Sequence, residues 1–313
     1  MSGAASGRPP GTPLSREAAT RSMSNQFHAP AVSVVVPCYN GGRFIDQLLA
    51  SLARQTFRDF EIIIVDDGST DPQTAAKLAA LAADIRVIRQ ENGGLSSARN
   101  TGFRAARADL VLPLDCDDSL EPQFLEETVA AMRTAPADVG FVFTDERLTG
   151  ARSGLANNRF NAFDQLFVNH LTYCMLLRKS AWRAVGGYDE NMRDGYEDWE
   201  FNIALAKAGY RGIGIRKPLS IYWVSSEGML MSRSSALHAR LWGYIRRKHR
   251  DLYRLPGLLR QWWKWRATPH DVSLAYALAL LAIAIVLPGA WFSALVRFVR
   301  ARRLANAAAA AAR

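Results

Sequence analysis

The sequence predicts an α/β fold in which a mixed, mostly parallel sheet is flanked by helices and followed by a helical appendage. Apolar runs without polar alternation recur between residues 32 and 114, as expected of strands that are buried on both faces. Stretches with helical periodicity separate these runs. The chain has 313 residues, of which 49% are hydrophobic, and this is enough for one large α/β domain plus an appendage.

Strands and helices are expected to alternate through the first part of this domain. We predict strands at 32–36, 61–65, 85–88 and 110–114, with helices at 43–54, 72–82 and 95–107 between them, and a later helix at 199–208. This order is typical of a Rossmann-like sheet. Ligands of such sheets bind outside the carboxyl ends of the strands.

Polar motifs follow all four of these expected strands. Pro37, Tyr39 and Asn40 come after the first strand, and Asp66 and Asp67 come after the second. The segment 92–94 follows the third strand, and the acidic segment 115–118 follows the fourth. Because the carboxyl ends of parallel strands meet at one edge of the sheet, we expect these motifs to line one crevice.

The acidic segment contains three carboxylates in four positions, Asp115, Asp117 and Asp118. Hard divalent ions such as Mg²⁺ and Mn²⁺ take oxygen ligands, and Mg²⁺ is often held by one or two carboxylates together with substrate phosphates. The segment therefore predicts a site for a metal and a phosphorylated substrate. The structural alternative is a turn and a helix cap before Glu121 and Pro122.

Net charge and cysteine usage restrict the partners and the compartment. The formal charge is +10, yet residues 31–227 carry 21 basic and 26 acidic side chains, whereas residues 228–313 carry 15 and 2. No nucleic-acid-binding module is recognisable, so we expect no nucleic acid partner; salt-sensitive binding through the basic C-terminal region is the alternative. Three widely spaced cysteines indicate neither a disulfide framework nor a zinc site, and favour a reducing compartment.

Five motifs in the same order resemble the family-2 glycosyltransferases of the inverting GT-A fold. They read VSVVVPCYNGG, EIIIVDDGSTD, ENGGLSSARNTG, LPLDCDD and GYEDWE, and the resemblance covers residues 31–235. It implies a GT-A domain that uses a nucleotide-diphosphate sugar, with a UDP-sugar favoured, and that depends on Mn²⁺ or Mg²⁺.

On the donor side, the resemblance implies that Asp66 or Asp67 accepts the N3–H of a uracil; capping and turn formation are the structural alternatives. Glycine at position 94 lets the backbone approach a ligand closely. Arg99 is expected to meet the base or a phosphate, and Arg233 a phosphate. The full set of expected donor-binding residues is Pro37, Tyr39, Asn40, Asp66, Asp67, Asn92, Gly94, Arg99, Asn100, Asp115 and Arg233.

On the catalytic side, the resemblance makes Asp117 the direct metal ligand and Asp115 a ligand of the ribose or the metal. Asp198 is the expected base that deprotonates the acceptor hydroxyl, and Glu197 orients that base or the acceptor. In-line attack on the anomeric carbon would then invert its configuration. The structural alternative for both carboxylates is helix capping, which the helix dipole favours.

The flanking segments divide the chain further. Residues 1–30 are rich in Gly, Ser, Pro and Ala and lack an apolar signal segment, so a disordered leader is expected. Residues 236–270 interleave aromatic and basic side chains, which is typical of an interfacial location. Residues 271–300 include an uncharged stretch, 272–296, long enough to cross a bilayer core of about 30 Å. Residues 301–313 are a tail.

We expect one spanning helix in 271–300 and a catalytic domain at the cytoplasmic face of a membrane. Pro288 and Gly289 interrupt the stretch, so an interfacial or re-entrant hairpin and a soluble packed helix are the alternatives. The predicted function is transfer of a sugar to a glycan or lipid-linked acceptor in surface polysaccharide or glycolipid synthesis. A nucleotidyltransferase and a non-catalytic sugar-nucleotide-binding scaffold or sensor are the rival interpretations.

Overall fold

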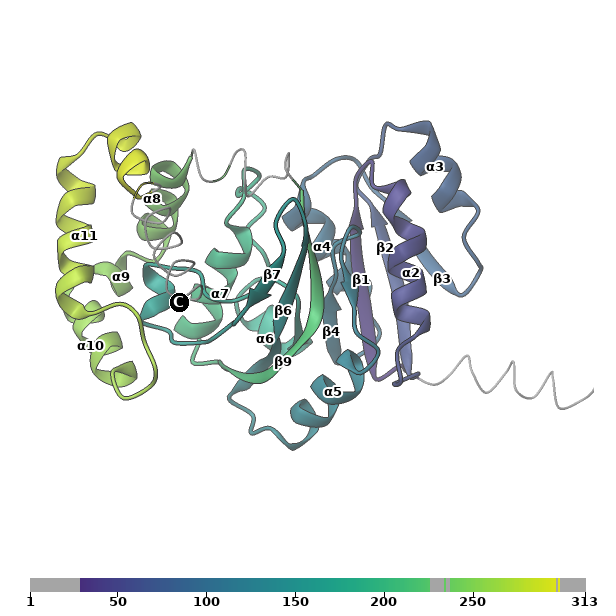
Figure 1. The fold of residues 1–313 in the computed structure, drawn as a ribbon, viewed down its shortest axis with the longest axis horizontal. Helices are drawn as coiled ribbons and strands as arrows, with labels where there is room; N and C mark the ends of the chain where they lie inside the picture. The colour runs from purple at the N-terminus through teal and green to yellow at the C-terminus, as the bar shows by residue number, and fades with distance from the viewer. Residues whose placement is uncertain (1–28, 226–233, 235–236, 297, 299–313) are drawn as a thin grey trace, which may run out of the picture.

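One mixed sheet runs through the molecule (Figure 1). The computed structural model describes residues 29–225, 234, 237–296 and 298. In these residues the strand order is β3-β2-β1-β4-β8-β6-β9-β5, with β7 paired to β6. The strands are β1 (Val32–Cys38), β2 (Phe60–Asp66), β3 (Ile85–Arg89), β4 (Leu110–Pro113), β5 (Ser119–Leu120), β6 (Val139–Gly150), β7 (Gly154–Ala156), β8 (Met175–Arg178) and β9 (Arg211–Val224). The predicted fold class is confirmed for the sheet and its helices.

Strands β1 to β4 form the parallel half. Val35 of β1 lies opposite Ile63 of β2 and Pro113 of β4, so β1 is the central strand of this half. Alternate residues of β1 face opposite sides: Val34 and Val36 join one hydrophobic core, and Val35 joins the other. Burial of both faces explains the continuous apolar run in the sequence.

The remaining strands make the sheet mixed. β8 pairs antiparallel with β4 and with β6, and β6 pairs in parallel with β9 over most of its length. The register between β6 and β9 shifts near Asp145, where Pro218 lies opposite. Pro218 cannot donate a ladder hydrogen bond, which fits its position at this irregularity. Beyond it, β9 pairs with the short strand β5 and so passes beside the acidic segment 115–118.

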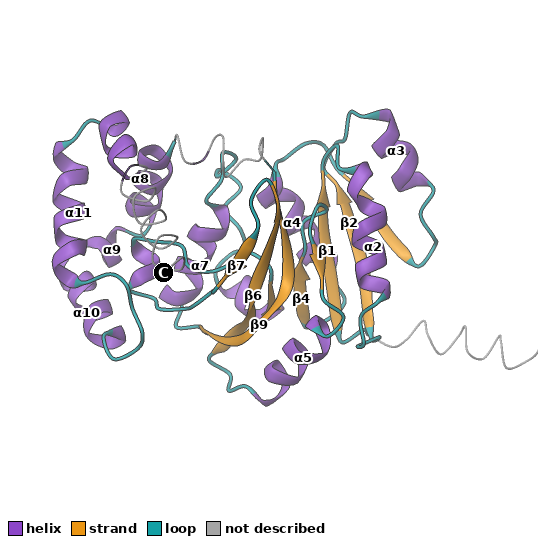
Figure 2. Cartoon of the chain, viewed as in Figure 1, coloured by secondary structure: helices purple, strands orange, loops and turns teal. Residues whose placement is uncertain are grey.

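Helices cover both faces of the sheet (Figure 2). α2 and α5 pack on the face of Val34, and α4, α6 and α7 pack on the face of Val35. The short helices η1 and α3 lie next to each other, beside α2 (Figure 1). Their bounds are η1 (Gly42–Phe44), α2 (Ile45–Ala53), α3 (Pro72–Ala79), α4 (Leu95–Ala105), α5 (Phe124–Thr134), η2 (Asp164–Leu166), α6 (Lys179–Ala184) and α7 (Glu197–Lys207).

Local chemistry explains where two of these helices lie. Asp71 caps α3 by accepting from the backbone N–H groups of Gln73 and Thr74, and Pro72 occupies the first turn, where its missing N–H costs nothing. On α4, a Cβ added at Gly102 would lie 2.2 Å from Cγ1 of Val35. Glycine at this position therefore lets α4 lie directly on β1, and this placement brings the preceding turn of α4, which carries Arg99, to the carboxyl ends of the strands.

A third core joins the C-terminal helices to the sheet domain. These helices are α8 (His238–Lys248), α9 (Arg250–Tyr253), α10 (Leu255–Trp265) and α11 (Leu274–Val286). Trp242 of α8 and Leu258 of α10 are buried with Trp199 and Ile203 of α7 and with residues of η2. His238 of α8 stacks on Trp242 and shares a hydrogen bond with the Tyr196 hydroxyl.

The expectation of one spanning helix in 271–300 is wrong for the described residues. α11 has 13 residues and ends at Val286, and Leu287 and Pro288 break the helix before a second helical stretch begins at residue 289. Proline at position 288 cannot donate the hydrogen bond that would continue α11. Within 29–225, 234, 237–296 and 298, no helix combines the length and the apolar character needed to cross a membrane.

Candidate active site

The acidic segment lies directly after β4, as expected, and its three carboxylates have different surroundings. Asp118 is buried. Its carboxylate accepts a hydrogen bond from the backbone N–H of Trp223 at 2.7 Å and another from the Tyr173 hydroxyl. That hydroxyl also accepts from the Asp115 backbone N–H at 3.0 Å. Asp118 and Tyr173 therefore hold the segment in place from β9 and from the chain before β8.

Arg99 connects the acidic segment to the GYEDWE motif. Its Nη2 donates to both carboxylate oxygens of Asp115, at 2.8 and 3.0 Å, and its Nη1 donates to Oε1 of Glu197 at 2.9 Å. The side chain is 1% exposed. Burial opposes its charge, but Asp115 and Glu197 keep the pKa of Arg99 well above its ordinary value. The two motifs thus belong to one site.

Aromatic rings complete the surroundings of this guanidinium. Its Cζ lies 4.8 Å from the ring centroid of Tyr173 and 5.4 Å from that of Tyr188. These distances are within the range of cation–π attraction. Tyr173 therefore has two roles, one through its hydroxyl and one through its ring, and neither has a signal in the sequence because both partners lie far away along the chain.

Asp198 differs from Glu197 in exposure and in partners. Glu197 is buried against Arg99, whereas Asp198 is partly exposed and accepts from Nδ2 of Asn169 at 2.9 Å. The Asn169 amide is itself oriented, because its oxygen accepts from Asn202 at 3.3 Å. Both carboxylates begin α7, after Tyr196 with a left-handed φ of 66°. Of the two, Asp198 is the one placed to meet a second molecule.

Burial changes the acidity of these groups. It raises the pKa of Glu197 to about 7, against the opposing effect of Arg99 and with a contribution from the Asp198 charge. It also raises the pKa of Asp198, although Arg99 and the Asn169 hydrogen bond act in the other direction. Elevated carboxylate pKa values in one cluster are typical of acid–base sites.

Asp117, like Asp118, forms no ion pair with a described residue, and only Asp115 of the segment is paired, with Arg99. Burial and the neighbouring Asp115 charge raise the pKa of Asp117 to about 6. A hard cation would relieve this uncompensated charge, and the oxygen donor chemistry fits Mg²⁺ or Mn²⁺. No three acidic, histidine or cysteine side chains of the described residues are grouped to hold a metal by themselves. The residues therefore fit an ion that takes few ligands from the protein and more from a substrate.

The expected donor-side aspartates are both buried and both bonded to protein groups. Asp67 accepts from the backbone N–H groups of Gly93 and Gly94, at 2.9 and 2.8 Å, and from the Gln90 side chain. Asp66 forms an ion pair with Arg89 at 2.7 Å. These contacts connect the loops after β2 and β3. The Asn92 side chain adds a further connection, because it donates a hydrogen bond to the Asp67 backbone carbonyl.

The other expected donor-binding residues differ in their exposure and in their hydrogen-bond partners. Asn40, with φ of 53°, accepts from the backbone N–H groups of Thr70 and Asp71 and so fixes the loop after β1 to the loop after β2. Tyr39 is exposed, whereas Pro37 is buried within β1. The Asn100 side-chain amide donates to the Tyr188 carbonyl and to Glu190, and its oxygen accepts from the Tyr188 backbone N–H and from the Trp182 indole. Arg233 lies outside the described residues.

Residues 33–184 match the profile of the family described as Glycosyl transferase family 2. The uncharacterized glycosyltransferase EpsJ of Bacillus subtilis (strain 168) is 34% identical over 210 residues, covering 62% of this chain and 61% of that protein. Chondroitin synthase of Escherichia coli is 30% identical over 188 residues, covering 58% of this chain and 27% of that protein. The matched part is thus less than two thirds of each relative's own length.

Solved structures share the fold at low sequence identity. TarS 1-349 of S. aureus, in complex with UDP-GlcNAc, has a TM-score of 0.57 and 21% identity, covering 81% of this chain and 81% of that chain. The mannosyltransferase PcManGT of Pyrobaculum calidifontis, in complex with GDP-Man and Mn²⁺, has a TM-score of 0.50 and 21% identity, covering 89% and 88%. The solved structures support the fold, and the profile match together with the five motifs identifies a glycosyltransferase family 2 domain in this chain.

Proposed function

We propose that this protein transfers a sugar from a nucleoside-diphosphate donor, with a UDP-sugar favoured, to a glycan or lipid-linked acceptor in polysaccharide or glycolipid synthesis. The observation that carries the proposal is the double contact of Arg99 with Asp115 and Glu197. It brings the motif suited to a metal and a diphosphate beside the motif suited to deprotonating an acceptor.

The donor side would use the joined loops after β1, β2 and β3. Asp66 and Asp67 keep a second lone pair on their oxygens, which can accept the N3–H of a uracil while the protein contacts persist. Relatives of the fold support a nucleotide-sugar, since TarS was solved with UDP-GlcNAc and PcManGT with GDP-Man. Tyr39, which is exposed just after β1, would contact the base or the ribose.

The acceptor side would use Asp198. Its carboxylate removes the proton of the acceptor hydroxyl, and the oxygen attacks the anomeric carbon as the bond to the nucleoside diphosphate breaks, which inverts the configuration. Asn169 orients the carboxylate, and Glu197 holds Arg99 beside it. Asp117, with Asp115 as the second candidate ligand, would hold Mn²⁺ or Mg²⁺; the bound ion supplies electrostatic stabilisation of the leaving diphosphate.

We place the enzyme at the cytoplasmic face of a membrane. The support for this location is the run of aromatic and basic residues in 236–270 and the excess of basic residues after 228. A lipid-linked acceptor would be reached from such a position.

The test is a donor panel of UDP-, GDP- and dTDP-sugars, each with Mn²⁺, Mg²⁺ or EDTA. Binding is measured by calorimetry, and slow hydrolysis is followed as release of the nucleoside diphosphate. We expect one donor to bind, and its signal to be lost with EDTA and in Asp117→Ala. Asp84→Asn, at an exposed turn, is the matched control. A folded protein that binds none of these donors would overturn the proposal.

Asp198→Asn separates the enzyme from its rivals. An inverting glycosyltransferase loses turnover in this variant and keeps donor binding. A scaffold or sensor that works by binding alone keeps its response to the donor. A nucleotidyltransferase would incorporate the nucleotide into its product, whereas a glycosyltransferase releases it as the diphosphate.

A further inference from the structure

Helix α10 exposes an apolar stripe at the end of the molecule opposite β3 (Figure 1). Leu255, Leu259 and Trp263 follow one another at intervals of four residues, which places them on one face of the helix. All three are exposed, and Trp263 is exposed to 64%. A large aromatic ring and two leucines in contact with solvent on one helix face indicate a surface that is covered in use.

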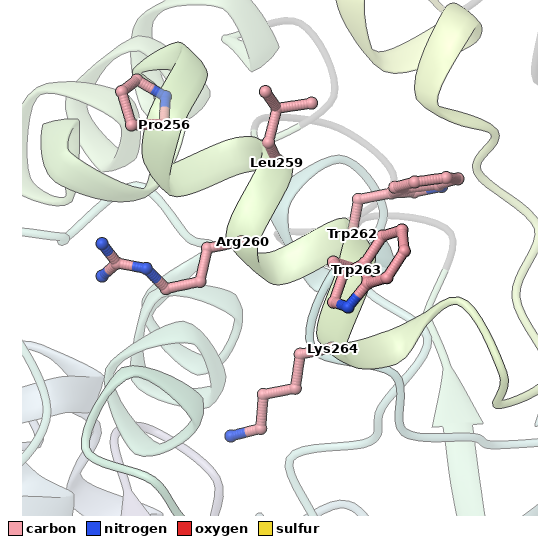
Figure 3. Close-up of a pocket in the computed structure, with 6 residues that line it drawn as sticks. All are labelled: Pro256, Leu259, Arg260, Trp262, Trp263 and Lys264. Carbon is pink, nitrogen blue, oxygen red and sulfur yellow. The ribbon is translucent and has the colours of Figure 1, made fainter.

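Positive charge accompanies this stripe. Arg260 and Lys264 extend from one side of α10, and Trp262 and Trp263 extend from the other (Figure 3). No ion pair with a described acidic residue is formed by Arg254, Arg260, Lys264 or Arg266, whereas Lys248 and Arg240 of α8 are paired with Asp189 and Asp194. The cations of α10 are therefore free to meet negative charge outside the protein.

The tryptophan rings line an open groove. Its volume is about 590 Å³, and it is bounded by Pro256, Leu259, Arg260, Trp262, Trp263 and Lys264 (Figure 3). Arg266 lies with its Cζ 3.5 Å from the Trp263 ring centroid. Indole rings beside guanidinium and ammonium groups match the headgroup level of a bilayer, where amphipathic rings and cations are both stabilised.

Helix α11 adds a second apolar face at the same end. Its exposed residues, at positions 275, 278, 279, 282, 285 and 286, are all alanine, leucine, isoleucine or valine, and Ile285 is exposed to 80%. They recur with helical spacing, so they form one continuous stripe over the length of the helix. The other face of α11 is anchored by Ala277 in the third core.

We infer that α10, assisted by the outer face of α11, docks this protein on an anionic lipid surface as a peripheral anchor. The reason for such docking, a lipid-linked acceptor, rests on the proposed function. The evidence for it is the apolar stripe and the cations of this surface. Nucleic acid would satisfy the cations and leave the leucines exposed, and an apolar protein partner would leave the cations without negative charge. A lipid surface offers acidic headgroups to the cations of the helix and acyl chains to its apolar stripe, so it complements both features.

The anchor and the catalytic base share a rigid connection. Leu258, on the inner side of α10, is fully buried in the core that contains Trp199 and Ile203 of α7. Asp198 stands at the start of the same α7. Docking of α10 would therefore set the orientation of the base relative to the lipid surface, as an acceptor held in that surface requires.

The test is co-sedimentation of the full chain with vesicles of equal parts phosphatidylglycerol and phosphatidylcholine, against vesicles of phosphatidylcholine alone. We expect binding to the anionic vesicles that weakens as sodium chloride is raised to about 1 M, where screening is nearly complete. Leu259→Glu with Trp263→Glu should abolish binding. Arg260→Ala with Lys264→Ala should weaken it by roughly tenfold or more, because each basic residue near an anionic surface contributes about 1 kcal/mol.

Matched controls lie away from this end of the molecule. Leu155→Glu changes an exposed leucine of β7, and Arg152→Ala removes an exposed arginine of the preceding loop. Both should bind vesicles like the wild type. Equal binding to neutral vesicles, no binding to either kind, or equal losses in the controls would overturn the inference.

Two further outcomes would name a different occupant. A dimer in light scattering that becomes a monomer in Trp263→Glu, without vesicle binding, would assign the stripe to a second copy. Stronger binding to duplex RNA than to anionic vesicles would assign it to nucleic acid. Donor hydrolysis in solution separates this inference from the proposed function. The α10 variants should still hydrolyse the donor, although they no longer bind vesicles. Asp198→Asn should lose donor hydrolysis and still bind vesicles.

Discussion

Arg99 on α4 and Glu197 at the start of α7 are 98 residues apart in the sequence, and their side chains meet at 2.9 Å. Both are buried, so neither charge is compensated by solvent. An isolated charge in such a position costs several kcal/mol, and the pair persists because Asp115 supplies a second partner for the same guanidinium. The contact therefore makes the positions of the acidic segment 115–118 and of the GYEDWE motif depend on one side chain.

Arg99→Ala should lower both stability and activity. It leaves Glu197 and Asp115 without their cation, and breaking a buried pair in this way costs about 3 to 5 kcal/mol of unfolding free energy. Urea unfolding followed by circular dichroism measures the loss. Arg104→Ala, on the exposed side of the same helix, is the control and should change stability by no more than about 1 kcal/mol. Equal effects of the two substitutions would contradict the linking role.

Tyr173→Phe removes a hydroxyl that bonds Asp118 and accepts from the Asp115 backbone. A buried carboxylate then loses a donor, so we expect a loss of about 1 to 3 kcal/mol of unfolding free energy. Metal-dependent donor binding should weaken as well, because the acidic segment is no longer held. Calorimetric titration measures this binding. Tyr210→Phe serves as the control, because the Tyr210 hydroxyl forms no hydrogen bond within the described part of the chain. Unchanged metal dependence would show that the segment keeps its position without Tyr173.

Asn169→Ala should shift the pH profile of turnover. Asn169 donates a hydrogen bond to the ionised form of Asp198 and so lowers its pKa, against burial and the Asp115 charge, which raise it. Without this donor the pKa of Asp198 rises further, and the acid limb of the rate profile should move to higher pH. The KM for the donor should stay constant. A uniform loss of rate at every pH would indicate a packing role only.

Asp117→Asn should stabilise the protein at neutral pH. The pKa of Asp117 is raised from 3.8 to about 6 by burial and by the Asp115 charge, so the cost to the folded state grows as the pH rises between these two values and is fully present above about 6. The substitution removes this cost, which is about 1 to 2 kcal/mol at pH 7 after solvent screening is allowed for. At pH 4 the wild-type carboxyl is largely protonated in the folded protein, and the gain should shrink toward zero. Thermal unfolding in EDTA at both pH values measures it.

Much of the parallel half of the sheet was predictable from local patterns. The strands expected at 32–36 and 61–65 are formed as Val32–Cys38 and Phe60–Asp66, and the helix expected at 95–107 as Leu95–Ala105. The helix expected at 72–82 ends earlier, at Ala79. These elements could be recognised because burial on both faces gives an apolar run, and because caps and glycines mark the ends of helices.

The appendage shows where such patterns fail. An uncharged stretch of about 25 residues is the usual sign of a spanning helix, yet residues 272–296 form α11, a break at Pro288 and a second helical stretch. Hydropathy measures how apolar a segment is, and it does not report whether the helix continues. Proline decided the outcome, together with the third core that takes up one face of α11.

The sequence by itself determined the order of the elements, the family motifs and the identity of the carboxylates, because these depend on residue type and on neighbours along the chain. Only the tertiary structure decided how the carboxylates are used. Arg99, which the sequence assigned to a base or phosphate, joins Asp115 to Glu197, and this link had no sequence signal. Tyr173 and Asn169 contact the carboxylates without any sequence signal either. Contacts between residues far apart in the chain follow from how the helices and strands pack, and no local pattern encodes that packing.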